Sequence, residues 1–231
     1  MSKAVIFDMY ETLITLYDSP VYFSTQMAED AGIPKEDFQK SWRMTEEDRT
    51  TGGVTVDEVI EDILKANNCF TMEKLKTIME KRIRYKREVF EHMHPEIIPL
   101  LETLKSKGYK IGLISNCYSE EAMVIKQSIL FPYFDAVCLS CEEGIKKPDH
   151  KIFERCMEKL CVDAADCLYV GDGGSQELET AREIGMYPVQ AVWYLKEGTS
   201  QPTGRMKEFT NIENPLGVIE TVCSFVSTEN G

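Results

Sequence analysis

The sequence has no apolar run that approaches the roughly 20 residues needed to cross a bilayer, and it lacks the architecture of a signal peptide. No internal repeat or low-complexity tract is present either, which excludes a solenoid. Zinc-binding spacing is missing too, since Cys138 and Cys141 form a lone CxxC without a second pair or a histidine cluster. We expect a globular cytoplasmic protein whose thiols are reduced and buried.

Positive charge is scarce, because 26 Lys and Arg stand against 39 Asp and Glu in 231 residues, for a formal net charge of −13. Such a surface repels a phosphate backbone, which argues against nucleic-acid binding through a broad basic face. A small phosphorylated substrate is compatible with this charge, because a few cations in a cleft can locally outweigh the global field. We expect a small-molecule substrate, no nucleic-acid or membrane partner, and a monomer or homodimer.

The hydrophobic pattern changes along the chain and predicts two kinds of structure. Ala4–Phe7 is a continuous apolar run that ends at Asp8, as in a strand buried on both faces. From about residue 20 to residue 90 the pattern predicts helices only, among them one from Lys35 to Arg49 and one that starts with a capping box at Thr55 and Glu58.

After Pro95, helices alternate with strands predicted at 110–114, 136–139, 168–170 and 188–192. This alternation predicts an α/β fold with a doubly wound, Rossmann-like parallel sheet, which the N-terminal strand must join because a lone strand buries nothing. The predicted domains are an α/β core over 1–15 and 93–231 and an inserted α-helical bundle cap over 16–92. Residues 199–214 are predicted to be loop.

Polar residues stand at the ends of these predicted strands, where ligands bind in open α/β sheets. They are Asp8 to Thr12 after the first strand, Ser115-Asn116 after the second, Lys147-Pro148-Asp149 before the helix at His150, and Gly171-Asp172 with Glu177 after the fourth sheet strand. Each segment alone could be a turn or a helix cap. Their order along one sheet predicts a single site with carboxylates, a hydroxyl and a lysine.

In this order the segments resemble the four motifs of the haloacid dehalogenase (HAD) superfamily. They are Val5-Ile6-Phe7-Asp8-Met9-Tyr10-Glu11-Thr12, Leu113-Ile114-Ser115-Asn116, Lys147-Pro148-Asp149 and Tyr169-Val170-Gly171-Asp172. The resemblance covers nearly the whole chain, including a helical cap between the first two motifs. It implies a hydrolase in which Asp8 is the nucleophile and forms a covalent aspartyl intermediate that water hydrolyses.

The resemblance also implies roles for the other residues. Ser115 and Lys147 would hold the transferred group, and Thr12 would orient the loop after Asp8. Asn116, Tyr10 and Arg43 are candidate substrate contacts. Mg²⁺, a hard cation that needs few protein ligands, would be held through oxygens of four residues, namely Asp8, Tyr10 (by its main-chain carbonyl), Asp172 and Glu177.

Tyr10 departs from the phosphatases of the superfamily, which carry there a second Asp that protonates the leaving oxygen and activates water. A phenol, with a reference pKa of ~10, is a poor general base near neutrality, and Glu11 is one residue out of register. In relatives, Tyr at this position goes with 2-haloacid dehalogenases, whose halide leaves without protonation. Such an enzyme needs a cation from the cap, for which Arg43 and Arg49 are candidates, although a surface salt bridge is the more frequent role of such residues.

The acidic pair Asp172 and Glu177 favours phosphatase chemistry, because dehalogenases usually carry Ser and Asn in this stretch and use no metal. A carboxylate beside Asp8 is repulsive unless a cation lies between them. Our first hypothesis is a Mg²⁺-dependent phosphohydrolase acting on a small phosphorylated metabolite. The alternatives are a 2-haloacid dehalogenase-type hydrolase and a catalytically weak ligand-binding or regulatory protein.

Overall fold

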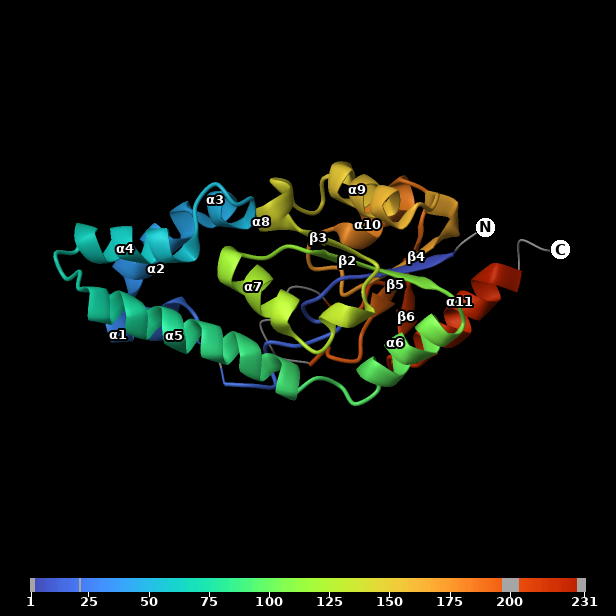
Figure 1. The fold of residues 1–231 in the computed structure, drawn as a ribbon, viewed down its shortest axis with the longest axis horizontal. Helices are drawn as coiled ribbons and strands as arrows, with labels where there is room; N and C mark the ends of the chain where they lie inside the picture. Colours follow the sequence, from blue (N-terminus) through green and yellow to red (C-terminus); the bar gives the residue numbers. More distant parts are fainter. Residues whose placement is uncertain (1–2, 21, 197–203, 228–231) are drawn as a thin grey trace.

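A computed structural model describes residues 3–20, 22–196 and 204–227, and these contain a six-stranded parallel sheet of order β3-β2-β1-β4-β5-β6 (Figure 1). Its strands are β1 (Ala4–Phe7), β2 (Lys110–Ser115), β3 (Ala136–Leu139), β4 (Cys167–Gly171), β5 (Tyr187–Ala191) and β6 (Thr210–Ile212). The predicted doubly wound α/β sheet is confirmed. The chain leaves β1 in one direction for β2 and β3 and later in the other for β4, so a ligand-binding crevice is expected between the ends of β1 and β4.

Helices cover both faces of the sheet, because alternate strand residues point to opposite sides. Val5 and Phe7 pack against three helices, α6 (Ile97–Ser106), α7 (Ser119–Gln127) and α11 (Gly217–Ser227). Ala4 and Ile6 pack on the other side against α9 (His150–Leu160) and α10 (Glu177–Glu183). Shorter pieces complete this part: α8 (Ser140–Glu143) and the 3₁₀ turns η1 (Val89–Glu91), η2 (Phe131–Tyr133) and η3 (Ala164–Asp166).

The described residues between β1 and α6 contain five α-helices, which are called here the helical unit: α1 (Ser24–Ala31), α2 (Lys35–Met44), α3 (Glu46–Thr50), α4 (Val56–Ala66) and α5 (Met72–Glu88). They bury a hydrophobic cluster of their own that includes Met27, Phe38, Ile60 and Ile78. The predicted capping box is present, since Thr55 and Glu58 each accept a main-chain N–H of the other. In Figure 1 the helical unit lies beyond the carboxyl ends of the strands.

Two local predictions are wrong. The helix expected over 35–49 is two helices, because Thr45 and Arg49 both donate hydrogen bonds to the Trp42 carbonyl and interrupt the regular pattern there. The loop expected over 199–214 contains β6, while residues 197–203 lie outside the described part. The side-chain carbonyl of Gln190 accepts hydrogen bonds from the N–H of Met206 and from the Asn211 amide and thereby holds this edge strand in place.

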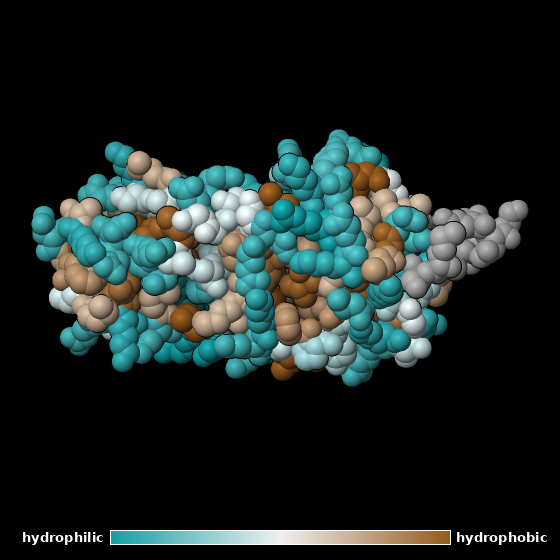
Figure 2. Space-filling model, turned by 45° about the horizontal axis from the view of Figure 1, so that its top comes forward, coloured by the Kyte–Doolittle hydropathy of each residue, from teal (hydrophilic) through white to brown (hydrophobic). Residues whose placement is uncertain are grey.

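On the face drawn in Figure 2, hydrophilic residues cover most of the surface and hydrophobic residues form separate patches. Within the described ranges, no helix combines the length and the apolar character that a bilayer-spanning segment requires.

Candidate active site

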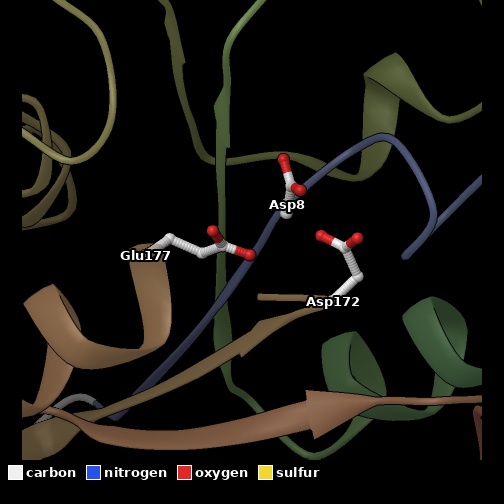
Figure 3. A group of neighbouring side chains, drawn as sticks. All are labelled: Asp8, Asp172 and Glu177. Carbon is white, nitrogen blue, oxygen red and sulfur yellow. The ribbon is translucent and has the colours of Figure 1, made fainter. Parts of the chain in front are cut away.

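Three carboxylates converge at the crevice between β1 and β4. Asp8 follows β1, Asp172 follows β4, and Glu177 is the first residue of α10. The N–H of Asp8 donates to the Val170 carbonyl at 2.9 Å, so the ends of the two strands are held in register. One oxygen from each carboxylate lies within 4.8 Å of the other two, and the three side chains point toward one another (Figure 3). Of the four residues predicted to hold the metal, the structure therefore brings together the side chains of three, Asp8, Asp172 and Glu177.

The loop between Asp172 and Glu177 is fixed by its own carboxylates. Glu177 accepts hydrogen bonds from the N–H groups of Gly173, at 2.6 Å, and Ser175, at 2.7 Å. Asp172 accepts one from Gly174 at 3.1 Å. Gly171 leaves the room that Glu177 needs, because a Cβ at position 171 would lie 2.8 Å from Glu177 Oε1. Both acidic side chains are thus held at the crevice before any ligand binds.

Burial and mutual repulsion make this cluster a poor place for three negative charges. Burial, followed by the charge of Glu177, raises the pKa of Asp172 to about 8. The pKa of Asp8 rises to about 6 for the same two reasons, although Lys147 opposes the shift. A divalent cation would remove this penalty, and a set of hard carboxylate oxygens fits Mg²⁺. Elsewhere in the described ranges, no group of three His, Cys, Asp or Glu side chains is arranged to hold a metal.

Lys147 supplies a positive charge directly beside Asp8. Its Nζ lies 2.5 Å from Asp8 Oδ1, and its side chain is almost entirely buried. Burial works against the ammonium, yet the negative charges of Asp8 and Glu177 raise the pKa of Lys147. Asn116 fixes the main chain of Lys147, because its amide accepts from Lys147 N–H at 2.8 Å and donates to Lys147 O at 3.1 Å. The sequence suggested a substrate contact for Asn116 and gave no sign of this bracket.

The hydroxyls of Ser115 and Thr12 are both buried and have no hydrogen-bond partner. Ser115 ends β2, next to β1, and Thr12 lies in the loop after Asp8, whose main chain Trp193 fixes by donating from Nε1 to Thr12 O at 2.9 Å. A buried hydroxyl without a partner costs free energy unless a ligand satisfies it. The two unpartnered hydroxyls lie at the end of β2 and in the loop after β1, next to the crevice.

A cavity of about 490 Å³ lies between the helical unit and this site. Tyr10, Asn116 and Ser175 line it on the side of the carboxylates. The helical unit contributes Ser24, Trp42, Glu46, Thr50, Arg82 and Lys86 to the wall, and Phe23 directly precedes α1. The other lining residues are Leu16, Cys117, Tyr118, Glu121 and Lys146. A cavity of this size suits a small organic ligand.

The remaining candidate residues fall in different places. Tyr10 lines the cavity, and burial raises the pKa of its phenol well above the ordinary value. Arg43 is exposed on α2 and does not line the cavity. Arg49, expected in a surface salt bridge, is instead buried against Trp42, with its guanidinium 3.6 Å from the ring centroid. Glu11 accepts hydrogen bonds from Thr15 and Leu16 and so braces its own loop.

A buried ion network in the cavity wall was missed from the sequence. Arg82 and Lys86 of α5 pair with Glu120 and Glu121 of α7, at 2.6 Å for Arg82 to Glu120 and for Lys86 to Glu121. The sequence did contain a signal for this network, because Arg82 and Lys86 are four residues apart and therefore lie on one face of a helix. It was hidden within a segment that is charged throughout.

Comparison with known proteins assigns the family. Residues 2–185 match the haloacid dehalogenase-like hydrolases. The chain belongs to this family. Its likeness to the haloacid dehalogenase-like hydrolases, inferred above from the four motifs, is thus confirmed, and the protein is a hydrolase.

Two relatives of this hydrolase carry phosphatase names. It is 26% identical over 202 residues to glyceraldehyde 3-phosphate phosphatase of Methanocaldococcus jannaschii, covering 82% of this chain and 85% of the relative. It is 28% identical over 208 residues to phosphoglycolate phosphatase of Aquifex aeolicus, covering 87% and 90%.

Solved structures of both a phosphatase and a dehalogenase share the fold of this chain. A HAD phosphatase from Thermococcus onnurineus has a TM-score of 0.68 and 23% identity, with 95% of this chain and 97% of the other covered. A 2-haloacid dehalogenase from Pseudomonas syringae has the same TM-score at 20% identity, with 97% and 100% covered. The fold alone therefore does not separate the two chemistries, and the side chains of the site must.

Proposed function

We propose that this hydrolase is a Mg²⁺-dependent phosphohydrolase that acts on a small phosphorylated metabolite. The observation that carries the proposal is the cluster of Asp8, Asp172 and Glu177, whose oxygens lie within 4.8 Å of one another in buried surroundings. Two of these carboxyls have a raised pKa, so the cluster favours a bound cation. The phosphatase names of the two relatives above support the same chemistry.

In this proposal Asp8 attacks the phosphorus atom, an O–P bond to Asp8 forms, and the bond from phosphorus to the leaving oxygen breaks. Water then attacks the same phosphorus and frees Asp8 and inorganic phosphate. The N–H of Met9, at 2.7 Å, and Lys147 both donate to Asp8 Oδ1 and fix the orientation of the nucleophile. Ser115 and Lys147 hold the phosphoryl oxygens, and Thr12 orients the loop.

Mg²⁺, held by Asp8, Asp172, the main-chain carbonyl of Tyr10 and Glu177, would neutralise the charge of the phosphoryl group in the transition state. The chain itself holds the carboxylate oxygens of Glu177 and Asp172 in place, because both side chains accept hydrogen bonds from main-chain N–H groups of the loop between them. A dehalogenase that works without a metal would not need this arrangement.

Tyr10 limits the choice of substrate in this proposal. Its phenol stays protonated at neutral pH and is too weak an acid to replace the missing carboxyl. Glu11 is engaged with Thr15 and Leu16. Substrates whose leaving group is stable as an anion, such as acyl or aryl phosphates, suit the site best.

We further propose that residues 16–92 act as a cap domain on a core of 1–15 and 93–231. The separate hydrophobic cluster of the helical unit and the cavity between it and the carboxylates support this division. We also propose that the protein works in the cytoplasm as a monomer or homodimer.

The test is phosphate release from acetyl phosphate and p-nitrophenyl phosphate, with Mg²⁺ and with EDTA, beside halide release from L-2-chloropropionate. We expect phosphate release that is lost in EDTA and in Asp8→Asn. The control is Asp135→Asn, a change at an exposed ion pair with Lys105, which should keep the activity. Halide release that persists in EDTA would replace the proposal with dehalogenase chemistry.

A further inference from the structure

We infer that this hydrolase takes aryl phosphate monoesters with an uncharged ring, and that its cavity rejects a leaving group carrying a second negative charge. The inference names a substrate class and rests on the proposed phosphohydrolase function. It follows from the way in which the cavity wall is charged and from the side chains that form it.

Among the described residues that line the cavity, each of the three cations is already paired with a glutamate. Arg82 lies 2.6 Å from Glu120, Lys86 lies 2.6 Å from Glu121, and Lys146 pairs with Glu47. The first two pairs are buried, with all four side chains at most 8% exposed. A carboxylate or second phosphate on the substrate would find no unpaired cation among these lining residues, because Arg49 is buried against the Trp42 and Tyr118 rings, and it would lie near Glu121. Burying an unpaired charge is strongly unfavourable.

Glu121 neutralises the positive charge of Lys86 at the cavity wall. Its Oε1 accepts from Lys86, and its Oε2 accepts from the N–H of Tyr118 at 2.9 Å, so the carboxylate is held on both oxygens. The charges of Lys86 and Arg82 lower the pKa of Glu121 despite its burial. Glu121 therefore stays ionised throughout the neutral range.

Aromatic rings form much of the remaining wall. Tyr10, Phe23, Trp42 and Tyr118 all line the cavity. Trp42 and Tyr118 meet edge to face, with centroids 6.0 Å apart. The buried Arg49 holds both from behind, with its guanidinium 3.6 Å from the Trp42 centroid and 4.7 Å from that of Tyr118. Rings fixed in this way favour a flat aromatic ligand over a small polar one.

The leaving-group chemistry agrees with the shape of the cavity. A phenolate is a far better leaving group than an alkoxide, so an aryl phosphate depends less on protonation by the enzyme. Phosphoglycolate, by contrast, combines an alkyl oxygen with a carboxylate. The cavity therefore disfavours it on both counts.

The first experiment isolates charge from leaving-group ability. It compares kcat/KM for 4-carbamoylphenyl phosphate and 4-carboxyphenyl phosphate, two aryl phosphates of similar shape that differ in one negative charge, and adds 2-phosphoglycolate. We expect the carbamoyl compound to be preferred at least about tenfold over the carboxy compound, because the carboxylate would be buried without a partner. We expect 2-phosphoglycolate to be the poorest of the three.

The second experiment frees the cation. Glu121→Gln keeps the hydrogen bond to Tyr118 N–H and leaves Lys86 without its partner, so the preference for the carbamoyl compound should shrink at least about fivefold. The matched control is Glu61→Gln, which breaks an exposed glutamate–lysine pair of the helical unit, with Lys65, and should leave the preference unchanged. Trp42→Leu should lower the ratio of kcat/KM for phenyl phosphate to that for acetyl phosphate by about threefold to tenfold.

The outcomes separate the two levels of the inference. If acetyl phosphate is hydrolysed but the carboxy and carbamoyl compounds are equally good, or 2-phosphoglycolate is the better substrate, the substrate class is wrong while the phosphohydrolase function stands. If no phosphate is released from acetyl phosphate or any aryl phosphate with Mg²⁺, both are wrong. Thermal melts of each variant verify that it is folded.

Discussion

The Nζ atom of Lys147 lies 2.5 Å from Oδ1 of Asp8, at the bottom of the site, with both side chains largely shielded from water. The pair holds Asp8 in one orientation and offsets its charge, which suits the nucleophilic role proposed for it. Asn116 brackets the main chain of Lys147, so this residue is fixed at its main chain as well as at its ammonium. Such preorganisation is where electrostatic catalysis gains most.

Replacing Lys147 with Met should therefore abolish most activity. We expect kcat for acetyl phosphate to fall by about 10²-fold or more, the range seen when one preorganised charge donor is removed. Steady-state kinetics at saturating Mg²⁺ measures the loss. Lys105→Met, which removes a lysine paired with Asp135 at the surface, is the control and should stay within about twofold. A Lys147→Met enzyme with nearly normal kcat would remove Lys147 from the chemistry.

Asp172→Asn should make the metal-free protein more stable while it abolishes activity. The pKa of Asp172 in the fold is raised to about 8, far above the ordinary 3.8 of an aspartate. Its ionisation therefore opposes folding increasingly as pH rises from about 4 to 8, and the penalty is complete above pH 8. In EDTA, the gain in unfolding free energy over wild type should thus be larger at pH 9 than at pH 5. Urea denaturation at both pH values measures it, and an equal gain would show that Asp172 is not destabilised by its surroundings.

Two glycines allow metal binding to be separated from general stability. A Cβ at position 171 would lie 2.8 Å from Glu177 Oε1, whereas one at position 112 would meet Cys156 Sγ at 2.9 Å in the core. We expect Gly171→Ala to weaken Mg²⁺ binding about tenfold, because it displaces a side chain that supports the metal site. Gly112→Ala should lower the melting temperature and keep the Mg²⁺ affinity. Calorimetric Mg²⁺ titration of both variants is the measurement, and equal affinities would exclude a metal role for Glu177.

Much of the site could be predicted because it depends on local signals. The strand ends at Asp8, Ser115 and Asp172 follow from apolar runs that stop at a polar residue, and parallel strands carry their ends to one edge of the sheet. Lys147 came from the order of the motifs, and the structure shows it against Asp8.

Contacts between distant segments could not be predicted in the same way. The Asn116 amide meets Lys147 across 31 residues, and no periodicity encodes that approach. Arg49 was expected in a surface salt bridge because it stands in an acidic helical segment, yet packing turns it onto Trp42 and Tyr118. Strand β6 has only three residues, too few for a pattern, and depends on the hydrogen bonds that Gln190 makes.

The last prediction concerns the buried pair of Arg82 and Glu120, which joins α5 of the helical unit to α7, a helix that packs on the sheet. Each side chain is 3% exposed, and Glu120 Oε2 has no hydrogen-bond partner. Arg82 is therefore the main group that stabilises the ionised carboxylate of Glu120. Arg82→Met should destabilise the protein by about 3–5 kcal/mol, the usual effect of leaving one buried charge unpaired.

The double variant Arg82→Met/Glu120→Leu should recover most of that loss, because no uncompensated charge remains. Burial already raises the pKa of Glu120, and losing Arg82 raises it further. Glu120 then becomes protonated in the fold at mildly acidic pH, so Arg82→Met should be less destabilising at pH 5 than at pH 8. Urea unfolding of the wild type, both single variants and the double variant at the two pH values gives the coupling energy. Additive effects at both pH values would mean that the two side chains do not stabilise each other, and that α5 is held to α7 by its other contacts, among them the Lys86–Glu121 pair.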